Sequence, residues 1–441
     1  MTARAFTVRS GWLTDEGRRL DASTYRAGAL QVRARIMNGP WTWRPLGAVS
    51  RLYTGSRFTR TYVSDAGRGV PYLTGTDMLA VDLNDPLYLS VAKTPQLDEL
   101  RVHKAWTLVS CSGTVGRTVF VRADMDGMAA SHDVIRCIPV QEVLPGYLFA
   151  FLSSTPGQAM IRQRTYGSVV QHIEPAHIAD LPVPILEMSV QESIDGLVGR
   201  AATARAQASR LLDEAAAWFN GQVPNPQHGS EHSRAVGLVR ASRLDRRLDA
   251  FHHVGWAAEA TLDGERLGDL ADVVATARVP RVYVERGVPF LSGIDVFRTR
   301  PTVRVRLARH IATAFDALVH AGEIAVQGSG QRYGLLGRVA YIGQQLDGWA
   351  ASHDLFRIVT GDPVKTARLF AYLRSDVGHR AMLRHSYGTS IPHVNPAGIA
   401  AIRVPPTPVE ITGKAARALE LRERADADEQ LAAAEVERWL G

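Results

Sequence analysis

The five residues AASHD at 129–133 return letter for letter at 350–354, an offset of 221 residues (350 − 129). The stretch GVPYLTGTDM at 69–78 returns as GVPFLSGIDV at 287–296, an offset of 218 (287 − 69). A solenoid would repeat every few tens of residues and at least three times. Two copies at one long offset therefore indicate a single internal duplication, so the chain carries one module twice.

A third pair of segments extends the duplication. YGSVVQHIEPAHIADLPVP at 166–184 matches YGTSIPHVNPAGIAAIRVP at 387–405, again at an offset of 221 (387 − 166). Each module also opens on RRLDA, at 18–22 and 246–250. Two such modules can fold with an approximate internal twofold axis, and a twofold reader matches a target made of two half-sites.

The composition indicates a globular protein with a basic bias. The 441 residues are 46% hydrophobic and 22% charged, which suffices for two ordinary cores. The net charge of +7 favours a polyanionic partner modestly. Cys111 and Cys137 have no counterpart in the second copy, so they predict neither a disulfide framework nor a zinc site. No long apolar run predicts a membrane span or a signal peptide, so we expect a cytoplasmic protein.

Short Val/Ile/Tyr-rich stretches come first in each module and helical patterns follow. WTLVSCSG at 106–113 and GRVAYIG at 337–343 predict strands with tight turns. LFAFL at 148–152 and LFAYL at 369–373, each followed by a glycine and basic residues, predict a helix pair. We therefore predict the α+β class, with two repeated mixed modules.

Each module ends in a heptad pattern, in which small or apolar residues alternate steps of three and four. In the first tail these residues are Ile194, Leu197, Ala201, Ala204, Ala208, Leu211, Ala215 and Trp218. In the second they are Ala415, Ala418, Ala425, Ala432, Val436 and Trp439, and the seam is interrupted by Arg422 and Glu429. The pattern predicts two long helices that pair antiparallel as a coiled coil and separate the modules, each about 45 Å long for thirty residues.

The chemical motifs do not favour an enzyme. The Ser, His and Asp of AASHD are consecutive, and neighbours on a strand point to opposite faces, so we expect a strand end or turn and no catalytic relay. GSGQRYGLLG at 328–337 lacks the Gly-Lys-Ser/Thr ending of a phosphate loop and predicts a loop that joins two strands. NDPLY at 84–88 departs from the base-binding motif of methyltransferases. We expect no catalytic residue, no metal and no cofactor bound by this chain.

Basic, aromatic and hydroxyl side chains are the candidates for DNA contacts, because they suit phosphates and base edges. A solvated charged surface is an equal alternative for any single arginine. The candidates in the first module are Arg57, Arg60, Arg68, Tyr72, Thr74, Arg117, Arg162, Arg164, Tyr166, Ser168 and Gln171. Those in the second are Arg278, Arg281, Tyr283, Ser292, Arg332, Tyr333, Arg384, Tyr387, Thr389 and Ser390.

The combined pattern resembles the DNA-specificity (S) subunit of type I restriction-modification enzymes. The resemblance rests on the Arg-Leu-Asp-Ala opening, Gly-Val-Pro-Tyr/Phe-Leu, Tyr-Gly-Ser/Thr before His-Ile/Val-x-Pro, Leu-Pro-Val-Pro and a long helix, all repeated once. It implies two target-recognition domains that each read half of a split DNA sequence. It also implies that the chain is not catalytic. S-adenosylmethionine and ATP would be bound by its partners, the methyltransferase and restriction subunits.

The resemblance also implies domain boundaries and partners. The expected segments are a first recognition domain at 1–187 with an N-terminal extension at 1–17, a central spacer helix at 188–219, a linker at 220–242, a second recognition domain at 243–407 and a C-terminal spacer helix at 408–441. The expected partners are double-stranded DNA, two modification subunits and restriction/translocase subunits, and no membrane. The helices would contact partner subunits through Leu197, Leu211, Trp218, Leu419 and Trp439.

Three alternatives stay open. The same architecture could serve as the DNA-recognition subunit of another phage-defence or DNA-modification complex. A self-contained enzyme is disfavoured by the missing methyltransferase, nuclease and nucleotide-binding motifs. A purely structural dimerisation scaffold would leave the Arg/Tyr clusters unexplained.

Overall fold

The computed structural model describes most of the chain. The described residues are Thr7, Tyr25, 28–83, 86–140, 142–166, 171–223, 241, 247–248, 250–253 and 263–441. The first RRLDA segment, Ser168, most of the linker predicted at 220–242 and, apart from Thr7, the predicted extension lie outside them. The chain divides into two compact units, Met1–Ala206 with Arg424–Gly441 (unit 1) and Gln207–Glu423 (unit 2). Both units mix strands and helices, which confirms the mixed composition predicted for each module.

Each unit contains a four-stranded antiparallel sheet with the same strand order. In unit 1 the order is β2 (Ser50–Thr54), β9 (Val134–Pro139), β6 (Thr107–Ser110) and β7 (Thr118–Phe120). In unit 2 it is β12 (Asp272–Ala275), β18 (Leu355–Val359), β15 (Ile324–Gln327) and β16 (Val339–Tyr341). In both sheets the strand that comes last in the sequence is inserted near one edge: β9 lies between β2 and β6, and β18 lies between β12 and β15. The predicted strands at 106–113 and 337–343 are β6 and β16, and 328–337 is a loop between strands, as expected.

A second sheet is also repeated. In unit 1, β4 (Gly69–Leu73) pairs parallel with β8 (Ala129–Ala130) and antiparallel with β5 (Leu87–Ser90), which pairs with β3 (Tyr62–Val63). In unit 2, β13 (Tyr283–Leu291) pairs parallel with β17 (Ala350–Ala351) and antiparallel with β14 (Arg306–Leu307). The short strands β8 and β17 are the alanines of AASHD. The motif therefore ends a strand in both units, as predicted.

The small strands β1 (Thr42–Pro45) with β10 (Pro182–Ile185), and β11 (Glu265–Arg266) with β19 (Arg403–Val404), form a third matching pair. In each unit this pair joins the beginning of the module to its end. The Leu-Pro-Val-Pro segment of the first module supplies β10, and its Val183 is fully buried.

The predicted helix pairs are confirmed in both units. They are α6 (Pro145–Ser153) with α7 (Thr155–Gln163), and α14 (Pro363–Arg374) with α15 (Asp376–Arg384). The hydroxyl groups of Ser154 and Ser375 cap the second helix of each pair by accepting from Gly157 N and Gly378 N. A Cβ at Gly157 would lie 2.1 Å from the Phe151 carbonyl oxygen, and one at Gly378 2.0 Å from that of Tyr372. Only glycine permits so tight a junction, which explains its recurrence.

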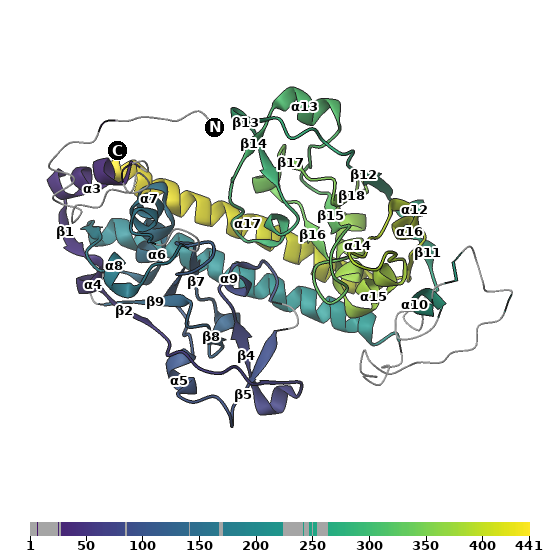
Figure 1. Cartoon of the computed structure of the whole chain (residues 1–441), viewed down its shortest axis with the longest axis horizontal. Helices are drawn as coiled ribbons and strands as arrows, with labels where there is room; N and C mark the ends of the chain where they lie inside the picture. Colours follow the sequence, from purple (N-terminus) through teal and green to yellow (C-terminus); the bar gives the residue numbers. More distant parts are fainter. Residues whose placement is uncertain are drawn as a thin grey trace. The chain divides into compact units, whose positions relative to one another are not determined.

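Two long helices complete the chain, α9 (Met188–Asn220) and α17 (Val409–Leu440), drawn in teal and yellow in Figure 1. Unit 1 contains α9 as far as Ala206 and α17 from Arg424 onward, and unit 2 contains the remaining parts. In unit 1, Arg200 contacts Asp428, while Arg205 contacts Asp426. Because the numbers rise in one helix and fall in the other, the two helices run antiparallel there.

The buried seam of the helices corrects the predicted heptad. It contains the predicted residues as far as Ala208 and also Ala215, but Leu212 and Phe219 are fully buried in place of Leu211 and Trp218, which are half-exposed. In α17, Leu440 is buried, and Trp439 is 40% exposed. An α-helix has 3.6 residues per turn, so a strict seven-residue pattern drifts around its surface.

This drift changes the predicted partner contacts. Leu197 and Leu419 are only 6% exposed and are already used inside the units, so the prediction that they bind a partner is wrong. The half-exposed side chains of Leu211 and Trp218 and the exposed indole of Trp439 remain candidates.

The two charged residues that interrupt the second seam do lie in it. Glu429 is buried in unit 1 and accepts a hydrogen bond from Arg205 Nε at 3.1 Å. Arg422 is buried in unit 2, with its guanidinium 5.7 Å from the centre of the Phe370 ring. Glu429 is thus paired with a cation, as the burial of a charge requires, and Arg422 lies against an aromatic ring.

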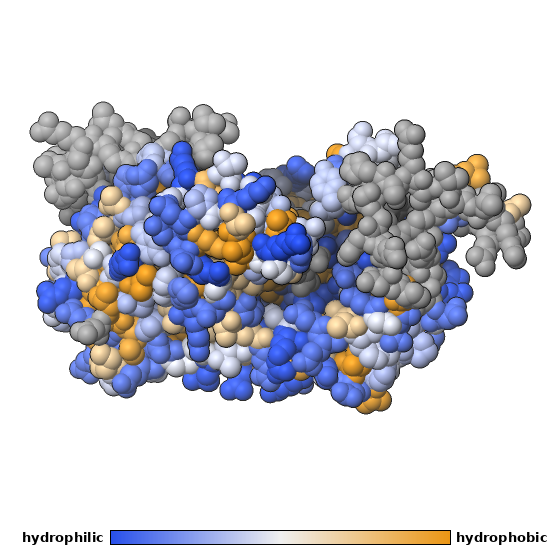
Figure 2. Space-filling model, turned by 90° about the horizontal axis from the view of Figure 1, so that it is seen from below, coloured by the Kyte–Doolittle hydropathy of each residue, from blue (hydrophilic) through white to orange (hydrophobic). Residues whose placement is uncertain are grey.

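One face of the described surface is largely polar. On the face drawn in Figure 2, hydrophilic residues predominate and hydrophobic ones form small groups. Among the described helices, none is both long and apolar enough to cross a membrane.

Candidate nucleic-acid interface

The AASHD turn has the same geometry in both units. In unit 1, Ser131 Oγ accepts a hydrogen bond from Asp133 N at 3.1 Å, and in unit 2 Ser352 Oγ accepts from Asp354 N at 3.2 Å. In unit 1 the carbonyl oxygen of Asp133 also accepts a hydrogen bond, at 3.0 Å, from the backbone N of Cys111, which directly follows β6. The motif is therefore a structural turn that joins the two sheets of each unit.

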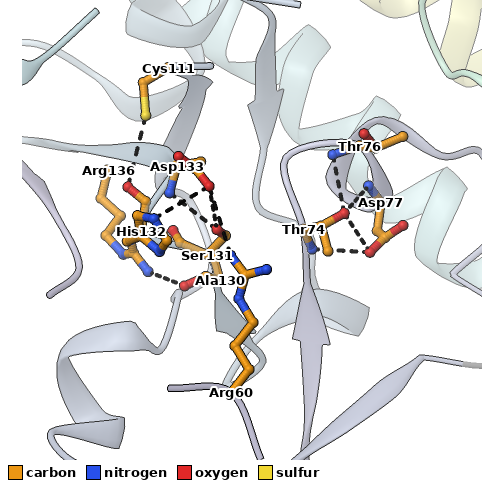
Figure 3. Close-up of polar contacts among 10 residues, drawn as sticks. All are labelled: Arg60, Thr74, Thr76, Asp77, Cys111, Ala130, Ser131, His132, Asp133 and Arg136. Carbon is orange, nitrogen blue, oxygen red and sulfur yellow. Dashed lines mark hydrogen bonds and ion pairs between the residues drawn. The ribbon is translucent and has the colours of Figure 1, made fainter. Parts of the chain in front are cut away.

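Ser131, His132 and Asp133 do not form a catalytic relay (Figure 3). The Ser131 hydroxyl lies 3.3 Å from the Asp133 carboxylate, and His132 Nε2 lies 3.5 Å from the same group. No hydrogen bond joins Ser131 to His132 in the part of the chain that the structure describes, and His132 Nδ1 is buried without a partner there. Burial lowers the pKa of His132, which favours its neutral form.

The two cysteines are also inert. Cys111 and Cys137 are both buried, and burial raises the pKa of each thiol to about 12. A protonated thiol is a poor nucleophile and a poor metal ligand. No group of three His, Cys, Asp or Glu side chains within the described ranges could hold a metal ion.

Arg60 stands on the exposed side of the turn and is held from two directions. Its Nη2 lies 3.8 Å from Asp133 Oδ2, and its guanidinium lies 5.7 Å from the centre of the Tyr72 ring. Tyr72 itself is only 1% exposed, because β4 points it into a cluster that includes Val70 and Leu89. The expected direct contact of Tyr72 with DNA is therefore excluded in this structure, and its ring supports Arg60 instead.

A cavity of about 210 Å³ lies beside the turn in unit 1. Its wall includes Arg57, His132, Asp133, His172 and Glu174. The Arg57 guanidinium, two imidazoles and two carboxylates line it, so it offers both hydrogen-bond donors and acceptors. Sequence reasoning had selected only Arg57 among these. Glu174 carried one local signal, since an acidic residue before Pro175 is typical of a helix start.

A tyrosine and a histidine are paired through their backbones in each unit. Tyr166 N donates to His172 O at 3.0 Å and His172 N to Tyr166 O at 2.8 Å. In unit 2, Tyr387 and His393 exchange the same two bonds, both at 2.8 Å. This Tyr–His pair holds Tyr166 and Tyr387 at the surface, 39% and 47% exposed. The neighbouring candidates are also exposed: Gln171, Thr389 and Ser390.

Several predicted arginines are held by structural contacts. Arg164 is 14% exposed at its side chain and lies 2.7 Å from Asp180. Arg332 Nε donates to Ser386 Oγ at 2.9 Å, and Arg384 Nε donates to the His252 carbonyl at 3.0 Å. These contacts tie the three guanidinium groups to neighbouring parts of the fold, so they favour a structural role over a direct contact with DNA.

Other predicted arginines are more accessible. Arg68 pairs with Asp65 at 3.4 Å and Arg162 with Gln158 at 3.3 Å, both at the surface, while Arg117 is half-buried. A last group is exposed and has no hydrogen bond or ion pair to any described residue: Arg57, Arg278 and Arg281. Side chains of this last kind are the best placed to meet phosphates.

The remaining candidates differ in accessibility. Tyr333 is 81% exposed, on a loop that Gln331 ties to the Ser390 carbonyl at 3.2 Å. Tyr283 is exposed as well, with its ring edge against Phe290. The hydroxyls of Thr74 and Ser292 each bind a carboxylate within their own turn, Asp77 and Asp295, so they stabilise those turns.

Comparisons with known proteins give the following similarities. No family model and no curated protein matches the sequence. Three solved structures are similar over 91% of this chain. The S subunit of a type I restriction-modification system from M. genitalium is 14% identical, with 94% of its chain covered and a TM-score of 0.32. The HsdS subunit from Thermoanaerobacter tengcongensis is 13% identical, with 96% covered and a TM-score of 0.28.

The third structure comes from work on complex assembly and conformational transition of the type I R-M system. It is 15% identical, with 95% of its chain covered and a TM-score of 0.29. Because all three identities and TM-scores are low, this likeness by itself assigns no function to the chain.

Proposed function

We propose that this chain is the non-catalytic, sequence-specific DNA-binding subunit of a cytoplasmic type I restriction-modification complex. Each unit reads one half of a bipartite target in double-stranded DNA. The chain directs two methyltransferase (modification) subunits, and the restriction/translocase subunits, to that target. S-adenosylmethionine and ATP are bound by those partners, while the long helices serve as spacers and as partner contacts.

One observation carries this proposal: two copies of one scaffold present different side chains at the same place. The sheet order, the AASHD turn and the Tyr–His pair are repeated. Around them, both units expose arginines at an offset of 221, Arg57 and Arg60 in unit 1 and Arg278 and Arg281 in unit 2. The units differ where Asn395 stands in place of Glu174, and where the longer loop between β15 and β16 exposes Tyr333. A duplicated scaffold with differing exposed polar groups suits two different half-sites, because base edges are told apart by their donors and acceptors.

A methyl-transfer assay tests the division of labour. The purified chain is incubated with labelled S-adenosylmethionine and DNA, with and without modification subunits from the same organism. We expect label in DNA only when both are present. Methyl transfer by this chain alone would refute the non-catalytic assignment.

Mapping of methylated sites in host DNA, with and without this gene, tests the bipartite target. We expect one gapped sequence to lose its methylation when the gene is deleted. An ungapped target would remove the two-reader proposal. If the chain recognises a gapped site but copurifies with other partners, it belongs to another phage-defence or modification complex.

Lengthening the helices tests their role as spacers. One heptad is inserted into α9 and one into α17, and the methylated sites are mapped again. We expect a longer gap between unchanged half-sites, since each added residue lengthens a helix by about 1.5 Å. A gap of unchanged length contradicts the spacer role.

A further inference from the structure

The two exposed tyrosines of the Tyr–His pairs differ in the state of their hydroxyl groups. In unit 1, Tyr166 Oη lies 2.8 Å from Glu174 Oε1. A carboxylate only accepts hydrogen bonds, so the tyrosine must be the donor. The hydrogen bond to Glu174 is also the main reason that the pKa of Tyr166 is raised, which keeps the hydroxyl protonated. Its single proton is thereby committed.

Glu174 is itself fixed by its position in the fold. It is the N-cap of α8 (Pro175–Ile178), and its side chain accepts from the backbone of His177 while the His177 ring accepts from Glu174 N at 3.0 Å. The Tyr166 ring is held by the imidazoles of His172 and His177, with ring centres 5.6 and 4.8 Å away. The direction of the hydroxyl is therefore set before any ligand arrives.

Unit 2 lacks this arrangement. The residue equivalent to Glu174 is Asn395 (395 − 174 = 221), whose side chain caps α16 (Pro396–Ala400) by accepting from Gly398 N at 2.7 Å. The hydroxyl of Tyr387 has no hydrogen bond to any residue that the structure describes. It can therefore donate or accept, whereas only the lone pairs of Tyr166 remain available.

We propose, on the basis of the proposed DNA-reading function, that Tyr166 is an acceptor-only specificity residue that recognises an exocyclic amino group of a base, with Glu174 as its positioning residue. Among base edges, the amino groups of adenine N6 and cytosine N4 are the donors in the major groove, and that of guanine N2 is the donor in the minor groove. Phosphate, thymine O4 and guanine O6 present only lone pairs, which Tyr166 repels. Tyr387 carries no such restriction.

Single amino-group deletions test this proposal in the full chain bound to its modification subunits. Once methylation mapping has given the target, each adenine, cytosine or guanine of the half-sites is replaced in turn by purine, 2-pyrimidinone or hypoxanthine, which lack the amino group. Wild-type protein should lose about five- to tenfold in affinity at one position of the half-site read by unit 1, in line with one hydrogen bond.

Two variants connect that loss to the pair of residues. Tyr166→Phe should bind the natural and the substituted duplex equally at this position and keep its discrimination elsewhere. Glu174→Asn keeps a cap of the kind that Asn395 provides but frees the hydroxyl, so it should shrink the penalty and, where the recognised amino group lies in the major groove, tolerate thymine or guanine there. As a matched control, Tyr387→Phe should change discrimination only in the other half-site.

The outcomes separate the two proposals. If wild-type protein binds no DNA sequence selectively, the proposed function fails. If it binds a defined target but Tyr166→Phe keeps every wild-type penalty, the function stands and the role of Tyr166 is refuted. If Glu174→Asn leaves the penalty unchanged, Glu174 does not set the hydrogen-bond direction.

Discussion

The two units bury an arginine at equivalent places in their main sheets and satisfy it in different ways. Arg136 in β9 is fully buried and, among the residues that the structure describes, donates only to main-chain carbonyl oxygens, those of Leu100, Ala130, Ser131 and Val134. No carboxylate within the described ranges pairs with it, and burial lowers the pKa of its guanidinium. Arg357 in β18 lies 3.3 Å from Glu323 and also pairs with Asp316.

A matching contrast exists between the two parts of the long helices α9 and α17 that belong to unit 1 and to unit 2. In unit 1, Arg205 is buried between Asp426 and Glu429, at 2.6 and 3.1 Å. In unit 2, the ion pair of Lys414 with Glu214, at 2.9 Å, is much more accessible to solvent. The duplication preserved the backbone but not the charges, which teaches that the stability of each unit depends on a different set of ion pairs.

The largest expected effect is that of Arg205→Ala. It removes the guanidinium that neutralises two buried carboxylates, so we expect the free energy of unfolding to fall by about 3–5 kcal/mol. Lys414→Ala serves as the control and should cost far less, because its pair is solvated. Urea unfolding followed by hydrogen exchange measures both, in 188–206 and 424–440 for Arg205 and in 207–220 and 409–423 for Lys414. Equal costs for the two variants would contradict this contrast between the two ends of the long helices.

The sheet arginines should respond differently to removal of their neighbours. Arg357→Met leaves Glu323 buried without its cation, and we expect a loss of about 3 kcal/mol. Adding Glu323→Gln should restore about 1 kcal/mol, because the stranded group is then neutral. For Arg136→Met no second substitution of this kind exists, because Arg136 pairs with no carboxylate among the described residues. A double-mutant cycle in denaturant measures this coupling, and additive costs in unit 2 would show that the pair is not coupled.

Two arginines of unit 1 separate DNA contact from positioning. Arg57→Ala should weaken DNA binding and lower the slope of log K against log salt by about 0.9, the change expected for one lost phosphate contact. Arg164→Ala should chiefly reduce stability, because its guanidinium binds Asp180. Binding titrations at several salt concentrations measure both slopes. If Arg164→Ala lowers the slope as Arg57→Ala does, the earlier expectation that Arg164 touches phosphate is restored.

The smallest effect concerns pH. Burial raises the pKa of Glu323 above its ordinary value of 4.5, so the folded unit 2 holds this proton more tightly than the unfolded chain. This contribution to stability is fully present below pH 4.5 and is lost as the pH rises through the folded-state pKa. Glu323→Gln should remove that component from the pH profile of unfolding. Identical profiles for the variant and the wild type would mean that Glu323 does not titrate in this window.

Local patterns in the sequence were sufficient for many elements. Strands β6 and β16, the helix pairs and the strand end at AASHD follow from alternation, from caps and from glycines that no larger residue could replace. The site was predictable only in part. Arg57 and Tyr333 were chosen for their chemistry and are exposed, but Tyr72 looked equally suitable and is buried, since the face to which a strand turns a side chain depends on what packs against it.

The sequence by itself determined that the chain is a duplication, that each copy is mixed α and β, and that each ends in a long helix, because these features depend on order and periodicity along the chain. Only the tertiary structure decided that Glu174 fixes the hydroxyl of Tyr166, that Arg205 compensates Glu429 across 224 residues, and that Leu212 replaces Leu211 in the seam. Such pairings depend on distances through space and on the small mismatch between seven residues and two helical turns, and neither is written in local order.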